Sequence, residues 1–494
     1  MYHLKSQHPS MLLAGADASQ PTIASVLARR NCDARRAEGI TQRLCNMMEK
    51  DMMPINTVDG EGFRELINFL EPGYRIPSRG TITSRLEARY TERKGELKAQ
   101  LASVNVALTT DCWTALTTES YITITCHYIA EDWQVKSAVL LTEIMSVRHT
   151  ADNLAHKLNE AVESWGLAGR VIACVHDNAA NIVAANNPTR VAWKSVTCFA
   201  HTLQLAINDG FGIYVYRVIV AAGKLVKHFH HSTPATKALE AKQQQMRLPT
   251  HRLIQSCKTR WNSVCEMFDR LVEQRWAVNA VLSDRTVTKL QDARVLELKD
   301  EYWQLMEDMA PVLAALKCAT TVMSAETEVS ISNTYPITFS LIDTHLMREE
   351  RDSSKVAEFK SKVRTSLGER MKVQSDDLTS TPAMIASMLD PRHKHLGFLT
   401  PVRRLAANAK LLELAAEVDV TTTDESSHAT DSGDEGGSQA GAAVQEATPQ
   451  SVRRASNAML LLLGDHYSTR TNDTETEVDN FLKDIPPPLN CPIN

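Results

Sequence analysis

The sequence of 494 residues lacks the features that define membrane and secreted proteins. Its longest strongly apolar run, Ala458 to Gly464, is far shorter than the roughly 20 residues of a membrane span. No apolar signal-peptide region follows Met1, and the ten cysteines have no framework spacing, which indicates reduced thiols. These absences predict an intracellular protein without a membrane segment.

The chain also lacks a strong excess of one charge. Its net charge of −5 gives no overall case for nucleic-acid binding, so charge has to be considered region by region. Between Phe211 and Arg275 there are eleven Lys and Arg against four Asp and Glu. This local basic excess is a candidate phosphate-facing surface, and the alternative is a face that docks the acidic tail of the same chain.

Apolar periodicity divides the chain into regions. Residues 20–101 have helical spacing, residues 102–210 alternate between strands and helices, and residues 211–412 form long helices broken at Pro and Gly. Residues 413–450 contain nine acidic residues and no Lys or Arg, which predicts a disordered linker. The fold class is therefore α/β, with a small helical region before the mixed sheet and a large one after it.

Two aspartates follow apolar strands in the 102–210 region. The order β-β-β-α-β-α-β-α predicts a three-strand antiparallel meander, and a right-handed crossover then places the fourth strand beside the first. Asp111 closes the predicted first strand and Asp177 the fourth, so both carboxylates are expected at neighbouring strand ends. A carboxylate pair of this kind suits Mg²⁺ and phosphoryl transfer, whereas the alternative is that both aspartates are helix caps or turn residues.

Several stretches in order resemble the hAT superfamily of transposases and, more closely, their domesticated relatives, the BED-type zinc-finger proteins. The resemblance covers residue 1 to about 400 and a part near the C-terminus, and it rests on these stretches: "GYRIPSRGTI", "TTDCWT" with Asp111, "HDNAANI" with Asp177, "CFAHTLQLAI" with Cys198 and His201, "KTRWNS" with Trp261, "YPITFSLI" and "ASMLDPRHKHL". It implies a ribonuclease-H-like mixed sheet interrupted by a large α-helical insertion, and cut-and-paste DNA chemistry.

The resemblance also implies a third catalytic acid, a Glu after the insertion, in a segment that supports dimerisation. No counterpart is found before Asn494, so residues 451–494 are interpreted as an incomplete C-terminal segment. Two carboxylates without the third make a poor metal cage, and we expect no strand cleavage. Half of a zinc finger at the N-terminus and a missing dimerisation segment at the C-terminus suggest a truncated gene model. A homo-oligomer is then expected to form through the missing segment.

Two motifs carry potential zinc ligands. His3 and His8 have the spacing of the second half of a zinc finger, and although a chance pair is the simpler explanation from spacing alone, the resemblance favours the tail of a BED finger in residues 1–10. Zn²⁺ is then expected only if the finger is completed upstream. Cys198 and His201 form half of a zinc pattern without a partner pair, and a structural role is the preferred interpretation.

The motif "KTRWNS" supplies the DNA-binding candidates Lys258, Arg260 and Trp261. By resemblance, Trp261 stacks on a flipped base, and the equally weighted alternative is a core tryptophan of the insertion. The preferred function is a transposase-derived nuclear protein that binds DNA and regulates transcription without cutting. The alternatives are an active or fragmentary metal-dependent transposase, and a protein-interaction scaffold.

Overall fold

Residues 32–257, 260–324, 330–425, 459 and 461–463 are described by the structure, which is a computed structural model. The chain divides into two compact units, Met1–Ser103 and Val104–Asn494. His3, His8 and Lys258 lie outside the described residues, as do residues 426–450 of the acidic linker and most of the C-terminal segment.

The first unit is helical, as the sequence predicts. Its described elements are α3 (Ala34–Lys50), the short 3₁₀ helix η2 (Ile55–Asp59), α4 (Glu61–Leu70) and α5 (Arg79–Leu101). Asp33 caps α3 by accepting a hydrogen bond from the backbone amide of Arg36, and Ser78 caps α5 in the same way. The apolar core that joins these elements consists of Leu44, Cys45, Met48, Val58 and Ile82.

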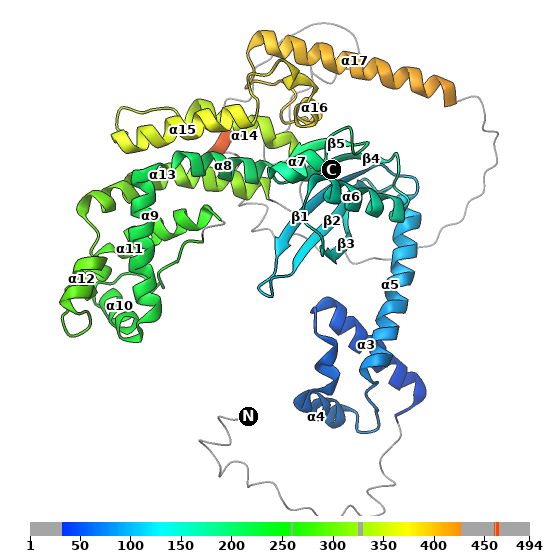
Figure 1. Cartoon of the computed structure of the whole chain (residues 1–494), viewed down its shortest axis with the longest axis horizontal. Coiled ribbons are helices and arrows are strands. Elements are labelled where there is room, and N and C mark those ends of the chain that lie inside the picture. Colours follow the sequence, from blue (N-terminus) through cyan, green and yellow to red (C-terminus); the bar gives the residue numbers. More distant parts are fainter. Residues whose placement is uncertain (1–31, 258–259, 325–329, 426–458, 460, 464–494) are drawn as a thin grey trace, which may run out of the picture. The chain divides into compact units, whose positions relative to one another are not determined.

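The second unit begins with a five-stranded mixed sheet (Figure 1). Its strands are β1 (Val106–Thr114), β2 (Ser120–Ile129), β3 (Val135–Ile144), β4 (Val171–His176) and β5 (Lys194–Thr197). The strand order is β3-β2-β1-β4-β5, with β1, β2 and β3 antiparallel and with β4 and β5 parallel to β1. The predicted meander and the placement of the fourth strand beside the first are therefore confirmed.

Side-chain alternation explains which face of the sheet is buried. In β2, Ile122, Ile124 and Cys126 are fully buried, as the period-two pattern predicts. Helix α6 (Ala151–Trp165) buries its stripe of Leu154, Leu158, Val162 and Trp165, and the Trp165 indole Nε1 donates to the Leu140 carbonyl of β3 at 3.1 Å. This hydrogen bond fixes the helix against the edge of the sheet.

Helices make up the rest of the second unit. They are α7 (Ala180–Ala185), α8 (Phe199–Gly210), α9 (Ile213–His231), α10 (Thr233–Gln245), α11 (Asn262–Ser283), α12 (Leu290–Leu296), α13 (Asp300–Met323), α14 (Thr334–Ser340), α15 (Ser354–Arg370), α16 (Pro382–Leu389) and α17 (Pro401–Glu425). The short turns η3 (Ile331–Asn333), η4 (Leu341–His345) and η5 (Asp376–Ser380) connect some of them. One apolar core runs from Phe199 of α8 through α9, α11, α13 and α15.

Helix α8 and helix α15 approach each other closely at Gly210. A Cβ atom at this glycine would overlap Cγ2 of Val363 and would lie 3.0 Å from ring carbons of Phe359. Glycine is therefore needed here for space, and the contact joins the helix that follows the sheet to the helical core.

A buried polar group closes the region of α16. Asp390 and Arg392 are 4% and 7% exposed and form an ion pair of 2.8 Å, and His393 Nε2 lies 2.7 Å from Asn333 Oδ1. The motif "ASMLDPRHKHL" thus supplies internal hydrogen bonds that hold the turn after α16 to η3.

The expected disorder from residue 413 is wrong for its first part, because α17 continues to Glu425. Leu, Ala and Glu are strong helix formers, and they make up residues 413–417, where the helix enters the acidic segment. Among the described residues, no single helix has the length and hydropathy of a membrane span, and only the bent pair of α8 and α9 passes when the two are taken together.

Candidate active site

The pairing of β1 with β4 leads toward the two aspartates. Thr109 pairs with Val175, which is the last β1–β4 pair, and Asp111 and Asp177 each follow two residues later. Adjacent strands lie about 4.8 Å apart, which is within reach of a shared cation for two carboxylates. Both aspartates also interact electrostatically with the Cys112 thiol and with the His201 imidazole. Both aspartates therefore lie near the same thiol and the same imidazole.

The sequence predicted Asp111 as the last residue of its strand, and the structure differs. Strand β1 continues to Thr114 and pairs with β2 as far as Ser120. The pairing with β4, however, stops two residues before Asp111. Asp111 therefore lies where the parallel part of the sheet ends and the β1–β2 hairpin continues, and the hairpin carries the stacked pair of Trp113 and Tyr121, with ring centroids 5.5 Å apart.

Hydrogen bonds fix the backbone around Asp177. The buried His176 lies with Nε2 2.8 Å from Ser195 Oγ of β5, and its carbonyl accepts from the Cys198 amide at 2.7 Å. Next to it, Asn178 Nδ2 donates to Thr202 Oγ1 of α8 at 3.0 Å. Asp177 is thus held between two residues that connect β4 to β5 and α8.

Each carboxylate keeps one oxygen available. Asp111 Oδ1 accepts from the Cys112 amide at 2.9 Å, and Asp177 Oδ1 accepts from the Ala179 amide at 2.9 Å. The bond to Ala179 is the local turn contact that the alternative interpretation expected for Asp177. Neither Oδ2 atom accepts a hydrogen bond within the described part of the chain, so both oxygens are free to face a cation.

Cys198 and His201 are joined side chain to side chain at the start of α8. Burial acts to raise the pKa of the Cys198 thiol, but hydrogen bonds with His201 outweigh it and hold the pKa below its usual range. The hydrogen bond to Cys198 raises the pKa of His201 against the effect of burial, and the charges of Asp177 and Asp111 raise it further.

The Cys112 thiol is inert by comparison. Burial, together with the charges of Asp111 and Asp177, raises its pKa to about 11. Within the residues that the structure describes, no three His, Cys, Asp or Glu side chains are grouped so that they could hold a metal ion.

The DNA-binding candidates are only partly placed. Trp261 is 4% exposed and packs in the helical core with residues of α11, which supports the packing alternative that the sequence left open. A ring buried in this way offers no free face to a base. Arg260 is exposed, whereas Lys258 lies outside the described residues.

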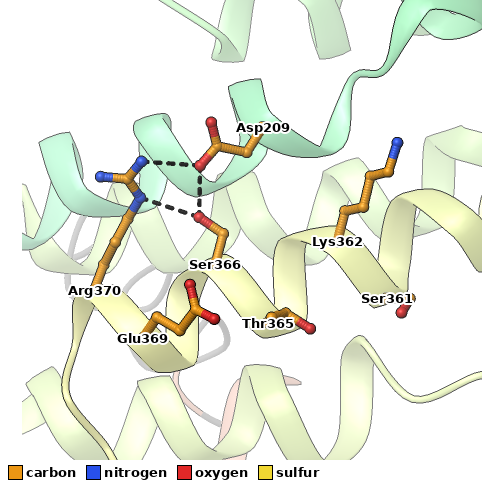
Figure 2. Close-up of a pocket in the computed structure, with 7 residues that line it drawn as sticks. All are labelled: Asp209, Ser361, Lys362, Thr365, Ser366, Glu369 and Arg370. Carbon is orange, nitrogen blue, oxygen red and sulfur yellow. Dashed lines mark hydrogen bonds and ion pairs between the residues drawn. The ribbon is translucent and has the colours of Figure 1, made fainter.

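A surface pocket lies between α8 and α15 (Figure 2). Three of its polar groups bond to one another: Asp209 accepts from Ser366 Oγ at 2.6 Å and from Arg370 Nη2 at 2.9 Å, and Arg370 Nε donates to Ser366 Oγ at 3.0 Å. These bonds join the two helices beside Gly210, so the pocket is part of the junction between the sheet and the helical core.

Sequence reasoning missed the contacts that position the acidic pair. His176, Asn178 and Thr202 lie within the stretches "HDNAANI" and "CFAHTLQLAI", directly next to the residues that were singled out. The signal was the polar residue on either side of Asp177. Their partners, however, come from other elements, so only the folded chain reveals them.

Family models match the sheet and the helices that follow it. The ZBED1 RNase-like domain matches residues 109–191, and the ZBED1 RNase-like helical domain matches residues 196–311. The first match contains Asp111 and Asp177, and the second begins just before Cys198 and His201. The ribonuclease-H-like α/β fold with a helical domain is thereby confirmed.

Curated relatives agree with these matches. Zinc finger BED domain-containing protein 4 of Homo sapiens is 24% identical over 380 residues, which cover 72% of this chain and 31% of the relative. Zinc finger BED domain-containing protein 6 of Homo sapiens is 25% identical over 408 residues, covering 76% of this chain and 40% of the relative. Putative AC transposase of Zea mays is 29% identical over 175 residues, covering 32% and 22%.

The chain is thus similar to BED zinc-finger proteins and to a hAT-type transposase. It spans between 22% and 40% of the length of these three relatives.

Proposed function

We propose that this chain is a transposase-derived nuclear protein that binds DNA and regulates transcription without cutting DNA strands. The observation that supports the proposal is the parallel pairing of β1 with β4 on a ribonuclease-H-like sheet, because Asp111 and Asp177 each follow the last β1–β4 pair by two residues. The kinship with BED zinc-finger proteins supports a regulatory role, and the kinship with a transposase supports DNA as the partner.

The acidic pair fits Mg²⁺ in part. The two free carboxylate oxygens of Asp111 and Asp177 are ligands of the type Mg²⁺ prefers, and this ion is often held by one or two carboxylates together with water and phosphate oxygens. When bound, the ion would neutralise charge on a phosphate at the end of β4.

The proposed absence of strand cleavage rests on the number of carboxylates at the site. Two-metal strand cleavage needs ligands for both the attacking and the leaving oxygen. Within its described residues the chain brings two carboxylates to this place, and no group of three potential metal ligands is assembled there. We therefore expect a DNA complex that forms in Mg²⁺ and leaves the strands intact.

A nicking assay tests this proposal. Supercoiled plasmid is incubated with the full chain in Mg²⁺ or Mn²⁺, in parallel with the Asp111→Asn and Asp177→Asn variants, which keep the side-chain shape and remove the charge. The expected result is no nicking above the no-protein background. Metal-dependent nicking that both substitutions abolish would establish the second candidate, an active or fragmentary transposase, which the intact acidic pair favours.

DNA binding is measured on the same protein by fluorescence anisotropy with a labelled duplex. Affinity that falls steadily as salt increases supports the proposal, because phosphate contacts release bound counterions. A chain without salt-dependent affinity would be a protein-interaction scaffold instead. A fluorescent fusion of the full chain tests the expected accumulation in the nucleus.

A further inference from the structure

One face of α9 is basic and exposed along most of the helix. Arg217, Lys224 and Lys227 are all exposed and lie within one third of the helix circumference, since their spacings are seven and three residues. We call these three residues the α9 basic face. Helix α9 contains no Asp or Glu, so no carboxylate of its own interrupts this face.

These three cations are not used for internal ion pairs. Over the described residues, Arg217, Lys224 and Lys227 form no salt bridge, whereas other cations of the helical region do. Lys317 with Glu266 at 2.9 Å is an example. Three long cationic side chains on one exposed face are therefore available to an external anion.

A second basic segment runs beside α9. His230 Nε2 is 2.8 Å from the Leu253 carbonyl, and Gln255 Nε2 lies 3.3 Å from the position of a Cβ on Gly223. Between Met246 and Arg260 the sequence contains no acidic residue. Arg252 and Arg260 of this segment are exposed, so it adds positive charge next to the α9 basic face.

Two nearby carboxylates are paired with cations of their own. On α15, Glu358 borders the same surface pocket as Arg217, and it is paired with Lys362 at 2.9 Å and with Lys355 at 3.5 Å. On α11, Glu273 is paired with Arg270 at 2.9 Å and contacts His251. These two carboxylates therefore offset little of the positive charge of the α9 basic face.

We infer that the α9 basic face contacts the phosphate backbone of double-stranded DNA. From Arg217 to Lys227 the helix rises about 15 Å, a length that holds about four phosphates on each strand of a B-form duplex. Three cations can therefore meet three separate phosphates. Contacts of this kind position a protein on DNA without reading its sequence. The inference rests on the proposed DNA-binding function and assigns it a surface separate from the acidic pair.

The exposed apolar side chains on the same side of α9 point to the alternative occupant. Ile213, Tyr216 and Val220 are 78%, 57% and 39% exposed. They would suit a protein partner, but the charge of the three cations favours DNA. The protein partner is therefore an outcome of the test.

The test replaces Arg217, Lys224 and Lys227 together by Gln in the full chain. The matched control replaces Lys289, Arg294 and Arg348 by Gln, because these are also exposed, form no salt bridge within the described residues and carry the same total charge. Circular dichroism checks the fold of both variants. A third protein, with Lys224→Arg and Lys227→Arg, keeps the charge.

Duplex affinity is then measured between 50 and 200 mM salt. Loss of three phosphate contacts is expected to reduce the slope of log affinity against log salt by about 2.7, so the advantage of the wild type over the α9 variant shrinks about 40-fold across this range. The control triple and the arginine variant should keep the wild-type slope.

The outcomes separate the two claims. If the wild type binds DNA and the α9 variant keeps its slope, or if both triple variants lose slope equally, the inference about α9 is wrong and the proposed function stands. If the wild type shows no salt-dependent affinity, the proposed function fails as well, and the face is assigned to a protein partner.

Discussion

The contact at Gly210 allows a quantitative prediction for the junction between the sheet and the helical core. In Gly210→Ala, the new methyl group overlaps Val363 Cγ2 and lies 3.0 Å from the Phe359 ring. Both neighbours are buried in the same core, Val363 at 0% and Phe359 at 1% exposure, so neither side chain can move into solvent. Inserting a carbon into a packed core of this kind costs about 1–3 kcal/mol of unfolding free energy.

The assay is urea unfolding followed by tryptophan fluorescence, because Trp261 and Trp303 are buried in this core. Gly368→Ala is the matched control. It lies in α15, where the nearest neighbours of its new Cβ are at 3.6 and 3.8 Å, which is ordinary contact. The control should be neutral or stabilised by up to about 1 kcal/mol through helix propensity. Equal stability of the two variants would refute the close packing of α8 on α15.

Two further predictions concern buried side chains. Trp261→Ala should lower the unfolding free energy by about 3–5 kcal/mol, because the ring lies in the core. Urea unfolding measures this loss. A variant with full stability and a selective loss of DNA affinity would instead favour base stacking. Burial lowers the pKa of His393 to about 4, so below pH 6.5 the unfolded chain binds a proton that the folded chain does not. Stability should fall by about 2 kcal/mol between pH 7.5 and 5.0, and His393→Gln should flatten this dependence.

The arrangement of the sheet was predictable from the sequence because its signals are local. The alternation of Ile122, Ile124 and Cys126 fixes the buried face of β2, and the apolar strand after a crossover helix fixes β4 beside β1. The approach of Asp111 to Asp177 follows from those two facts. It needs no knowledge of side-chain contacts.

Other features depend on contacts between distant residues and were missed for that reason. The sequence around Gly210 does not indicate that Phe359 and Val363, in a helix about 150 residues later, lie next to it. The two interpretations of Trp261 differ only in burial, which a short motif cannot report. The boundary at residue 413 was wrong because composition was averaged over a segment whose first residues continue α17.

Helix α8 connects the edge of the sheet near the two aspartates to the helical core. Its first turn carries His201, whose imidazole interacts electrostatically with Asp177 and Asp111. Near its other end, Asp209 accepts a hydrogen bond from Arg370 of α15. Twelve residues separate these ends by about 18 Å of rigid rod. Helix α8 therefore connects the surroundings of Asp111 and Asp177 to the helical core through one continuous helix.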